Sequence, residues 1–313
     1  MSGAISGAIA QTPEAAVTRR PKGPIVWLDM DQQELDDAYD QSVYAPNQPH
    51  VHARRAAASA RARALLGEPL RLAYGETPIE QLDVYRAAQP HAPINVYVHG
   101  GAWRNGRSAD FAFLAEMVVH AGAHSVILDF ANIDEAGGNL MTMARQVRKA
   151  VAWVYRNAES FGGDRNRLYV TGHSSGGHLG GCGVTTDWQK EFGLPPDIIK
   201  GALLASGMYD LKPVRLSKRS KYVAFTDEIE EELSAQRHID RLHCPLVVAY
   251  GTLETPEFQR QARDFFAALQ AAGKPAKLIV GEGYNHFEIA ETLANPYGLL
   301  GRPLLAQMGL GRE

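Results

Sequence analysis

The stretch RLYVTGHSSGG at residues 167–177 decides the fold class. Its first five residues, RLYVT, are rich in β-branched and aromatic side chains and predict a strand. GHSSG at 172–176 follows at once and fits the pattern G-x-S-x-G around Ser174, because centring it on Ser175 would require glycine at position 173. Between a strand and a helix, this pattern places a serine on a sharp turn whose glycines let backbones pass closely. The alternative is a tight glycine turn with an incidental serine, but the turns described next favour a nucleophile.

A second glycine-rich turn, HGGAW at 99–103, directly follows the predicted strand INVYVH at 94–99. Backbone N–H groups in such a turn stabilise the oxyanion that forms when a carbonyl is attacked, and one donor contributes roughly 3–4 kcal/mol to the transition state. We therefore predict an oxyanion hole made by the N–H groups of Gly100, Gly101, Ala102 and Ser175. The alternative is a structural β-turn.

A nucleophilic serine needs a histidine base, and the base needs a carboxylate that holds its tautomer. Among the 11 histidines, we predict His286 as the base, because GYNHF at 283–287 follows the last predicted strand. The acid lies in the loop after the strand that ends near Tyr250, where Glu254 and Glu257 both occur. We favour Glu254, because Glu257 is placed to begin the next helix, where a carboxylate stabilises the helix dipole.

Other histidines carry less chemical signal. His99 and His173 flank the two glycine turns, and we expect them to hold loops. His120 and His124 have a spacing seen in metal sites, but they straddle Gly122, and we assign them no carboxylate partner. We therefore predict neither a metal site nor a cofactor. A dinucleotide is also disfavoured, because no G-x-G-x-x-G follows an early strand.

Strand and helix patterns alternate along the chain. Strands are predicted at 70–74, 81–85, 94–99, 125–129, 167–171, 202–205, 246–250 and 277–280, and helices at 31–39, 53–66, 111–121, 141–161 and 257–272. Such alternation is typical of an α/β protein with a mostly parallel central sheet covered by helices on both faces.

The domain organisation is predicted as one α/β domain at 25–313 after a loose tail at 1–24, although the length alone also allows two domains. The charged stretch 211–242 breaks the alternation and contains no clear strand. It is either a small lid inserted between two strands or a surface helix with loops.

Composition excludes several classes of protein. The chain has 32 Lys and Arg against 35 Asp and Glu, and this net charge of −3 disfavours a nucleic-acid-binding protein. Its two cysteines, Cys182 and Cys244, are too few for a disulfide scaffold and indicate reduced thiols, although one bridge between them stays open. No apolar run is long enough to span a membrane, and the first residues lack the features of a secretory signal. We expect a cytoplasmic protein that binds neither membranes nor nucleic acid.

The motifs together resemble the α/β-hydrolase fold, within it the hormone-sensitive-lipase-like branch, and most of all the kynurenine formamidase (arylformamidase) group. The matching pieces are HGGAW at 99–103, FGGDRNRLYVTGHSSGGHL at 161–179, SGMYDL at 206–211, YGTLETPEFQRQ at 250–261 and NHFE at 285–288. The resemblance implies a triad of Ser174, Glu254 and His286, in the chain order of this fold. Ala102 stands where broad esterases of the branch usually have a third glycine, which favours the formamidase group.

The resemblance also implies an activity: metal-independent serine hydrolysis of a small acyl group, on an aryl formamide such as N-formylkynurenine, through an acyl-enzyme. The alternatives are a carboxylesterase or aryl-amidase of the same fold and, in another class, a ligand-binding protein that has lost the chemistry.

Aromatic residues near the motifs suggest a flat substrate. We expect Trp103, Phe130 and Tyr284 to line the substrate pocket, and Phe287 to belong to the core. The predicted partner is thus a small acyl compound with an aromatic group. The sequence leaves the oligomeric state open, a homodimer included.

Overall fold

A computed structural model describes residues 20–311. Its main sheet has eight strands in the order β10-β9-β8-β7-β5-β6-β4-β3. The strands are β3 (Leu70–Ala73), β4 (Gln81–Tyr85), β5 (Ala92–Val98), β6 (His124–Leu128), β7 (Gly163–His173), β8 (Gly201–Ala205), β9 (Leu246–Gly251) and β10 (Ala276–Gly281). From β10 to β6 all neighbours are parallel, whereas β4 pairs antiparallel with both β6 and β3. The predicted strands and the mostly parallel sheet are confirmed.

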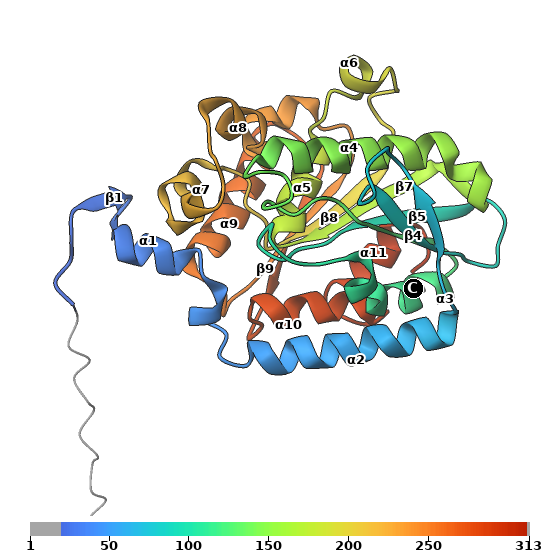
Figure 1. The fold of residues 1–313 in the computed structure, drawn as a ribbon, viewed down its shortest axis with the longest axis horizontal. Helices are drawn as coiled ribbons and strands as arrows, with labels where there is room; N and C mark the ends of the chain where they lie inside the picture. Colours follow the sequence, from blue (N-terminus) through green and yellow to red (C-terminus); the bar gives the residue numbers. More distant parts are fainter. Residues whose placement is uncertain (1–19, 312–313) are drawn as a thin grey trace, which may run out of the picture.

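Helices cover both faces of this sheet (Figure 1). One face carries α4 (Leu140–Asn157), α5 (Ser175–Val184) and α9 (Pro256–Ala271), and the other carries α2 (Gln48–Leu66), α3 (Ala115–His120), α10 (His286–Glu291) and α11 (Gly301–Gln307). Successive strand residues alternate between two hydrophobic clusters; Val96 and Val98 pack with the first set of helices, and Tyr97 between them packs with the second. This period of two is what a sheet buried on both faces requires.

Most helix predictions are confirmed with small changes of boundary. The helix expected at 53–66 begins earlier, at Gln48, with a proline in its first turn, and the one expected at 111–121 divides into a 3-10 segment, Ser108–Leu114, and α3. The sequence did not predict α10 or α11, because both are short and α11 contains Gly301 and Pro303. None of the helices in residues 20–311 is long and apolar enough to cross a bilayer.

Residues 25–38, before α2, form a small hairpin and a helix. Residues 1–19 of the expected tail lie outside the described residues. The hairpin consists of β1 (Ile25–Trp27) and β2 (Met30–Asp31). The guanidinium of Arg20 contacts the Asp31 carboxylate at 2.6 Å. The helix α1 (Gln32–Ala38) begins at Asp31 with a capping box and confirms the helix expected at 31–39.

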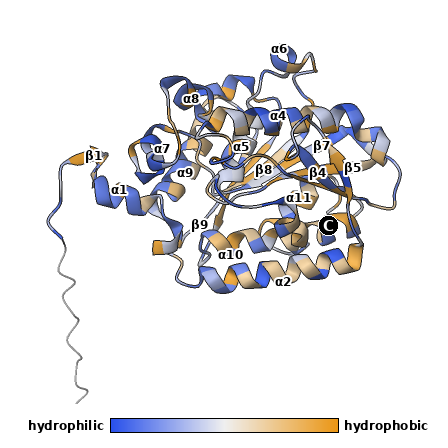
Figure 2. Ribbon diagram, viewed as in Figure 1, coloured by the Kyte–Doolittle hydropathy of each residue, from blue (hydrophilic) through white to orange (hydrophobic). Residues whose placement is uncertain are grey.

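The charged segment 211–242 lies between β8 and β9 and is described throughout. It holds the helices α7 (Lys212–Leu216) and α8 (Asp227–Glu232) and the 3-10 segments Lys218–Lys221 and Ala235–Arg241, with no strand. α7 and α8 are mostly hydrophilic, in contrast to the hydrophobic strands of the sheet (Figure 2). Cys182 and Cys244 are both buried and free.

Candidate active site

The predicted nucleophile turn lies between β7 and α5. Ser174 has φ 61° and ψ −128°, a backbone conformation that residues other than glycine rarely adopt, and α5 begins at the next residue. The flanking glycines are required by close contacts. A Cβ at Gly172 would lie 2.3 Å from the Gly176 carbonyl oxygen, and one at Gly176 would lie 2.0 Å from the Val98 carbonyl oxygen. The turn therefore holds the serine hydroxyl at the carboxyl edge of the sheet, against the end of β5.

The three residues predicted for the triad meet at this edge. The Ser174 Oγ lies 2.8 Å from His286 Nε2, and His286 Nδ1 lies 2.8 Å from Glu254 Oε2. Ser174 follows β7, Glu254 lies in the loop after β9, and His286 is the first residue of α10 beyond β10. All three side chains are buried, with at most 8% of any residue exposed.

Glu254, rather than Glu257, contacts the histidine. Its second oxygen, Oε1, accepts hydrogen bonds from the Ser206 hydroxyl at 2.6 Å and from the Gly251 N–H at 2.7 Å. Burial raises the pKa of Glu254 to about 7, although these two hydrogen bonds oppose that shift. Glu257 lies in the first turn of α9, where it pairs with Arg260 at 2.7 Å. The alternative that the sequence left open is thus decided in favour of Glu254 as the partner of His286.

The charges around His286 favour its neutral form. Burial, with the positive charges of Arg55 and Arg219, holds the pKa of His286 well below its ordinary value. His173, in the nucleophile turn, contacts the backbone of His286: its Nε2–H donates to the His286 carbonyl oxygen at 2.8 Å. The imidazole nitrogen that faces Ser174 is therefore free to accept a proton.

The second glycine turn lies directly beside the nucleophile. A Cβ at Gly100 would lie 2.8 Å from the His173 carbonyl oxygen and 3.1 Å from Ser174 Cβ, so only glycine permits this approach. Gly101 and Ala102 have φ angles of 120° and 55°. Within residues 20–311, neither of their N–H groups donates a hydrogen bond to the protein. The Trp103 N–H donates to Ser175 Oγ at 3.2 Å and ties this turn to the start of α5.

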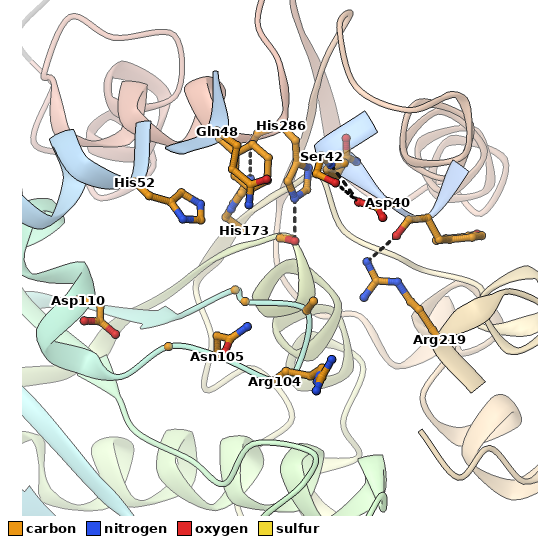
Figure 3. Close-up of a pocket in the computed structure, with 18 of the residues that line it drawn as sticks. Asp40, Ser42, Gln48, His52, Arg104, Asn105, Asp110, His173, Arg219 and His286 are labelled. Carbon is orange, nitrogen blue, oxygen red and sulfur yellow. Dashed lines mark hydrogen bonds between the residues drawn. The ribbon is translucent and has the colours of Figure 1, made fainter. Parts of the chain in front are cut away.

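A cleft of about 910 Å³ opens at these residues (Figure 3). Its wall includes Gly100, Gly101, Ala102, Ser174 and His286. Aromatic side chains also line the cleft, and they include Tyr39, His52, Phe111, Tyr222 and Phe287. Five cationic side chains do so as well: Arg55, Arg104, Lys218, Arg219 and Lys221. The segment 211–242 thus supplies part of the wall, through residues 218–222.

The predicted pocket aromatics are wrong, because none of the three lines this cleft. Trp103 turns inward, where its Nε1–H donates to His178 Nδ1 at 3.3 Å, and Phe130 stacks on His99 with ring centroids 4.3 Å apart. Tyr284 lines a separate surface depression. Phe287, expected in the core, lines the cleft instead, since its position directly after His286 carries it to the same edge.

Several cleft residues had no signal in the sequence. Tyr39 follows α1, Arg55 lies on α2, and Arg219 lies in the segment 211–242, all far in sequence from the glycine turns. Only the packing of these segments over the carboxyl edge of the sheet brings them to Ser174. No cluster of metal-ligand side chains is found within residues 20–311.

Comparisons with known proteins agree on a hydrolase. The BD-FAE family model matches residues 82–201. Kynurenine formamidase of Danio rerio is 31% identical and aligns with 90% of this chain and 98% of its own. Esterase LipC of Mycobacterium tuberculosis is 28% identical over 65% of this chain and 55% of its own. Among solved structures, a thermophilic esterase from the planctomycete Thermogutta terrifontis superposes with a TM-score of 0.66 at 20% identity, covering 79% of this chain and 97% of that one. That likeness shows the α/β-hydrolase fold.

Proposed function

Because the chain belongs to the kynurenine formamidase family of α/β-hydrolases, we propose that this hydrolase removes a small acyl group from an aryl formamide such as N-formylkynurenine, with Ser174 as its nucleophile. The observation that carries the proposal is the continuous hydrogen-bonded chain from Ser174 through His286 to Glu254, with both contacts at 2.8 Å. The two ring nitrogens of His286 thus serve two different partners.

In the first half of the reaction, Ser174 Oγ attacks the carbonyl carbon while His286 Nε2 takes the hydroxyl proton. Glu254 accepts the Nδ1–H hydrogen bond, which holds the tautomer and stabilises the imidazolium that forms. Its own position is held by Ser206 and by the Gly251 N–H. The low pKa of His286 keeps Nε2 unprotonated before the attack.

Attack on the carbonyl leaves a negative charge on its oxygen. We assign the N–H groups of Gly101, Ala102 and Ser175 to this oxyanion, because the first two have no acceptor in the described part of the chain and the third opens α5. Gly100 contributes the close approach between the two turns.

Collapse of the tetrahedral intermediate breaks the bond between the acyl carbon and the leaving nitrogen, which takes the proton from His286. Water then attacks the acyl-enzyme; His286 accepts one of its protons and returns it to Ser174 Oγ as the ester bond breaks. The products are the free aromatic amine and the carboxylic acid, formate for a formamide.

The aromatic wall supports a flat leaving group. Phe111, Tyr222 and Phe287 each line the cleft beside the serine. Stacking on such rings contributes roughly 0.5–1.5 kcal/mol per pair beyond the burial of area. An aromatic amine held there would leave its acyl group at Ser174.

A carboxylesterase is the second candidate, and the similarity to Esterase LipC favours it. The two are separated by kcat/KM on formanilide, acetanilide and phenyl esters with acyl chains from formyl to hexanoyl. We expect formanilide to be cleaved faster than acetanilide, and the esters to be cleaved more slowly as the acyl chain lengthens. A kcat/KM that climbs with chain length, with no formanilide hydrolysis, would instead establish the esterase.

A further inference from the structure

One cationic side chain of the cleft is buried without a counter-charge. Arg219 is only 6% exposed. Its guanidinium donates to the Tyr222 hydroxyl at 3.0 Å and to the Tyr39 carbonyl oxygen at 3.1 Å, and it lies over the Trp103 ring at 5.3 Å. All three partners are uncharged, and within residues 20–311 no carboxylate lies within salt-bridge distance of Arg219 and nothing accepts its Nε–H.

Two carboxylates around this part of the cleft, Asp40 and Glu257, are already engaged. Asp40 also lines the cleft, but it pairs with Lys218 at 2.5 Å. Glu257 accepts the Tyr39 hydroxyl and pairs with Arg260. A buried charge without a partner is unfavourable, and a well-placed anion offsets much of that cost.

The cleft as a whole is positive although the chain is not. Five of its lining residues are Lys or Arg and two are Asp, whereas the complete chain has a net charge of −3. A concave wall of one sign concentrates ligands of the opposite sign. A guanidinium has five N–H donors, of which Arg219 uses only two; its Nε is buried, so two terminal N–H groups remain for an anion.

We propose that Arg219 is a specificity-determining residue that binds a carboxylate on the substrate, so that the preferred substrate is an aryl acyl compound with an acidic side chain. The inference rests on the proposed function and adds to it the residue that would recognise the carboxylate that N-formylkynurenine itself carries. Arg219 and His52 lie on opposite sides of His286 (Figure 3), so the carboxylate would lie on the Arg219 side while the acyl carbonyl meets Ser174. Planar carboxylates suit the fork of an arginine better than the single ammonium of a lysine.

The test uses two substrates that differ only in charge: 4-(2-formamidophenyl)-4-oxobutanoate and its primary amide. For the wild type we expect kcat/KM to be at least tenfold higher for the acid than for the amide, and the ratio to fall as NaCl is raised. Arg219→Gln should bring the ratio to within about threefold of unity, and Arg219→Lys should restore part of it. Arg241→Gln is the matched control: it removes one charge from the same segment, outside the cleft, and should leave the ratio unchanged.

Three results would overturn the proposal: a wild-type ratio near unity, a folded Arg219→Gln variant that keeps the ratio, or a loss of the ratio in Arg55→Gln alone. If Arg219→Gln does not fold, Arg219→Lys decides, because a ratio lowered at least threefold supports the proposal and an unchanged ratio refutes it.

A second pair separates this inference from the proposed function: 3-(4-acetoxyphenyl)propanoate and its primary amide. If the wild type cleaves these esters but neither formamide, the formamidase activity is refuted. The role of Arg219 is then decided by the ratio of kcat/KM for the acid ester to kcat/KM for its amide, in the wild type and in Arg219→Gln. Wild type that cleaves neither pair refutes both.

Discussion

The imidazole of His173 holds His286 from its backbone side. Its Nε2–H donates to the His286 carbonyl oxygen at 2.8 Å, and the two rings lie 4.7 Å apart at an angle of 42°. Burial and the neighbouring His286 keep the pKa of His173 well below its ordinary value, so the ring stays neutral. We therefore expect His173 to be a positioning residue, although it occupies a variable place in the G-x-S-x-G pattern.

Replacing His173 by leucine should lower kcat about tenfold to a hundredfold with little change in KM, because a small displacement of the base is costly. His173→Gln, whose amide N–H can still donate, should recover much of the loss. Steady-state kinetics at several pH values check this. A fall in thermal stability with kcat unchanged would show that the contact serves folding alone.

Ser174→Ala should abolish labelling by a fluorophosphonate probe and reduce kcat by about 10⁶-fold, as loss of a triad serine does elsewhere. Ser175→Ala is the neighbouring control. It should keep the label and lose only about tenfold in kcat, because its hydroxyl merely holds the Trp103 N–H. Labelled peptides identified by mass spectrometry decide between them, and label on Ser175 would contradict the assignment.

Glu254→Gln should lower kcat by about 10³–10⁴-fold, because an amide cannot stabilise the imidazolium of His286. Glu257→Gln should leave kcat within a few fold and reduce the free energy of unfolding by about 1–3 kcal/mol, since it weakens a buried pair with Arg260. Kinetics and denaturant titration of both variants test the contrast. If Glu257→Gln instead lowered kcat more than Glu254→Gln does, the triad role would belong to Glu257.

The value of kcat/KM should rise with pH through a midpoint near pH 7 and level off at higher pH. The active form has a neutral His286, whose pKa is lowered, and an ionised Glu254, whose pKa is raised to about 7, so protonation of either group on acidification removes activity. Arg219→Gln removes a positive charge that disfavours an added proton on the hydrogen-bonded pair of His286 and Glu254, so the rise in kcat/KM should move to higher pH. A rise that stays in place or moves to lower pH would contradict this electrostatic account.

Two glycines of the same region should respond to alanine in opposite ways. Gly176→Ala would place a Cβ 2.0 Å from the Val98 carbonyl oxygen. We therefore expect the free energy of unfolding to fall by several kcal/mol and the activity to be lost. Gly183 lies inside α5, and a Cβ there would meet open space. Gly183→Ala should therefore raise the free energy of unfolding by about 0.5–1 kcal/mol. Denaturant unfolding measures both, and equal effects would refute the close packing of the two turns.

Local sequence determined the parts of this protein that depend on neighbouring residues. RLYVT followed by GHSSG predicted a strand, a strained serine turn and a helix start, because glycine spacing and β-branched residues act over a few positions. HGGAW likewise predicted the second turn. The alternation of strands and helices then indicated the parallel sheet, whose carboxyl edge collects the loops that hold Ser174 and His286.

The tertiary structure alone decided what depends on side-chain direction and on distant segments. Glu254 and Glu257 are three residues apart, and only their position against Ser206 and Arg260 separates the partner of His286 from a structural ion pair. Proximity in sequence to the glycine turn predicts Trp103 in the pocket, yet Trp103 has a left-handed backbone and its ring contacts His178. Arg219 reaches the cleft because the segment 211–242 packs over the edge of the sheet, and no local pattern records which surface such a segment will cover.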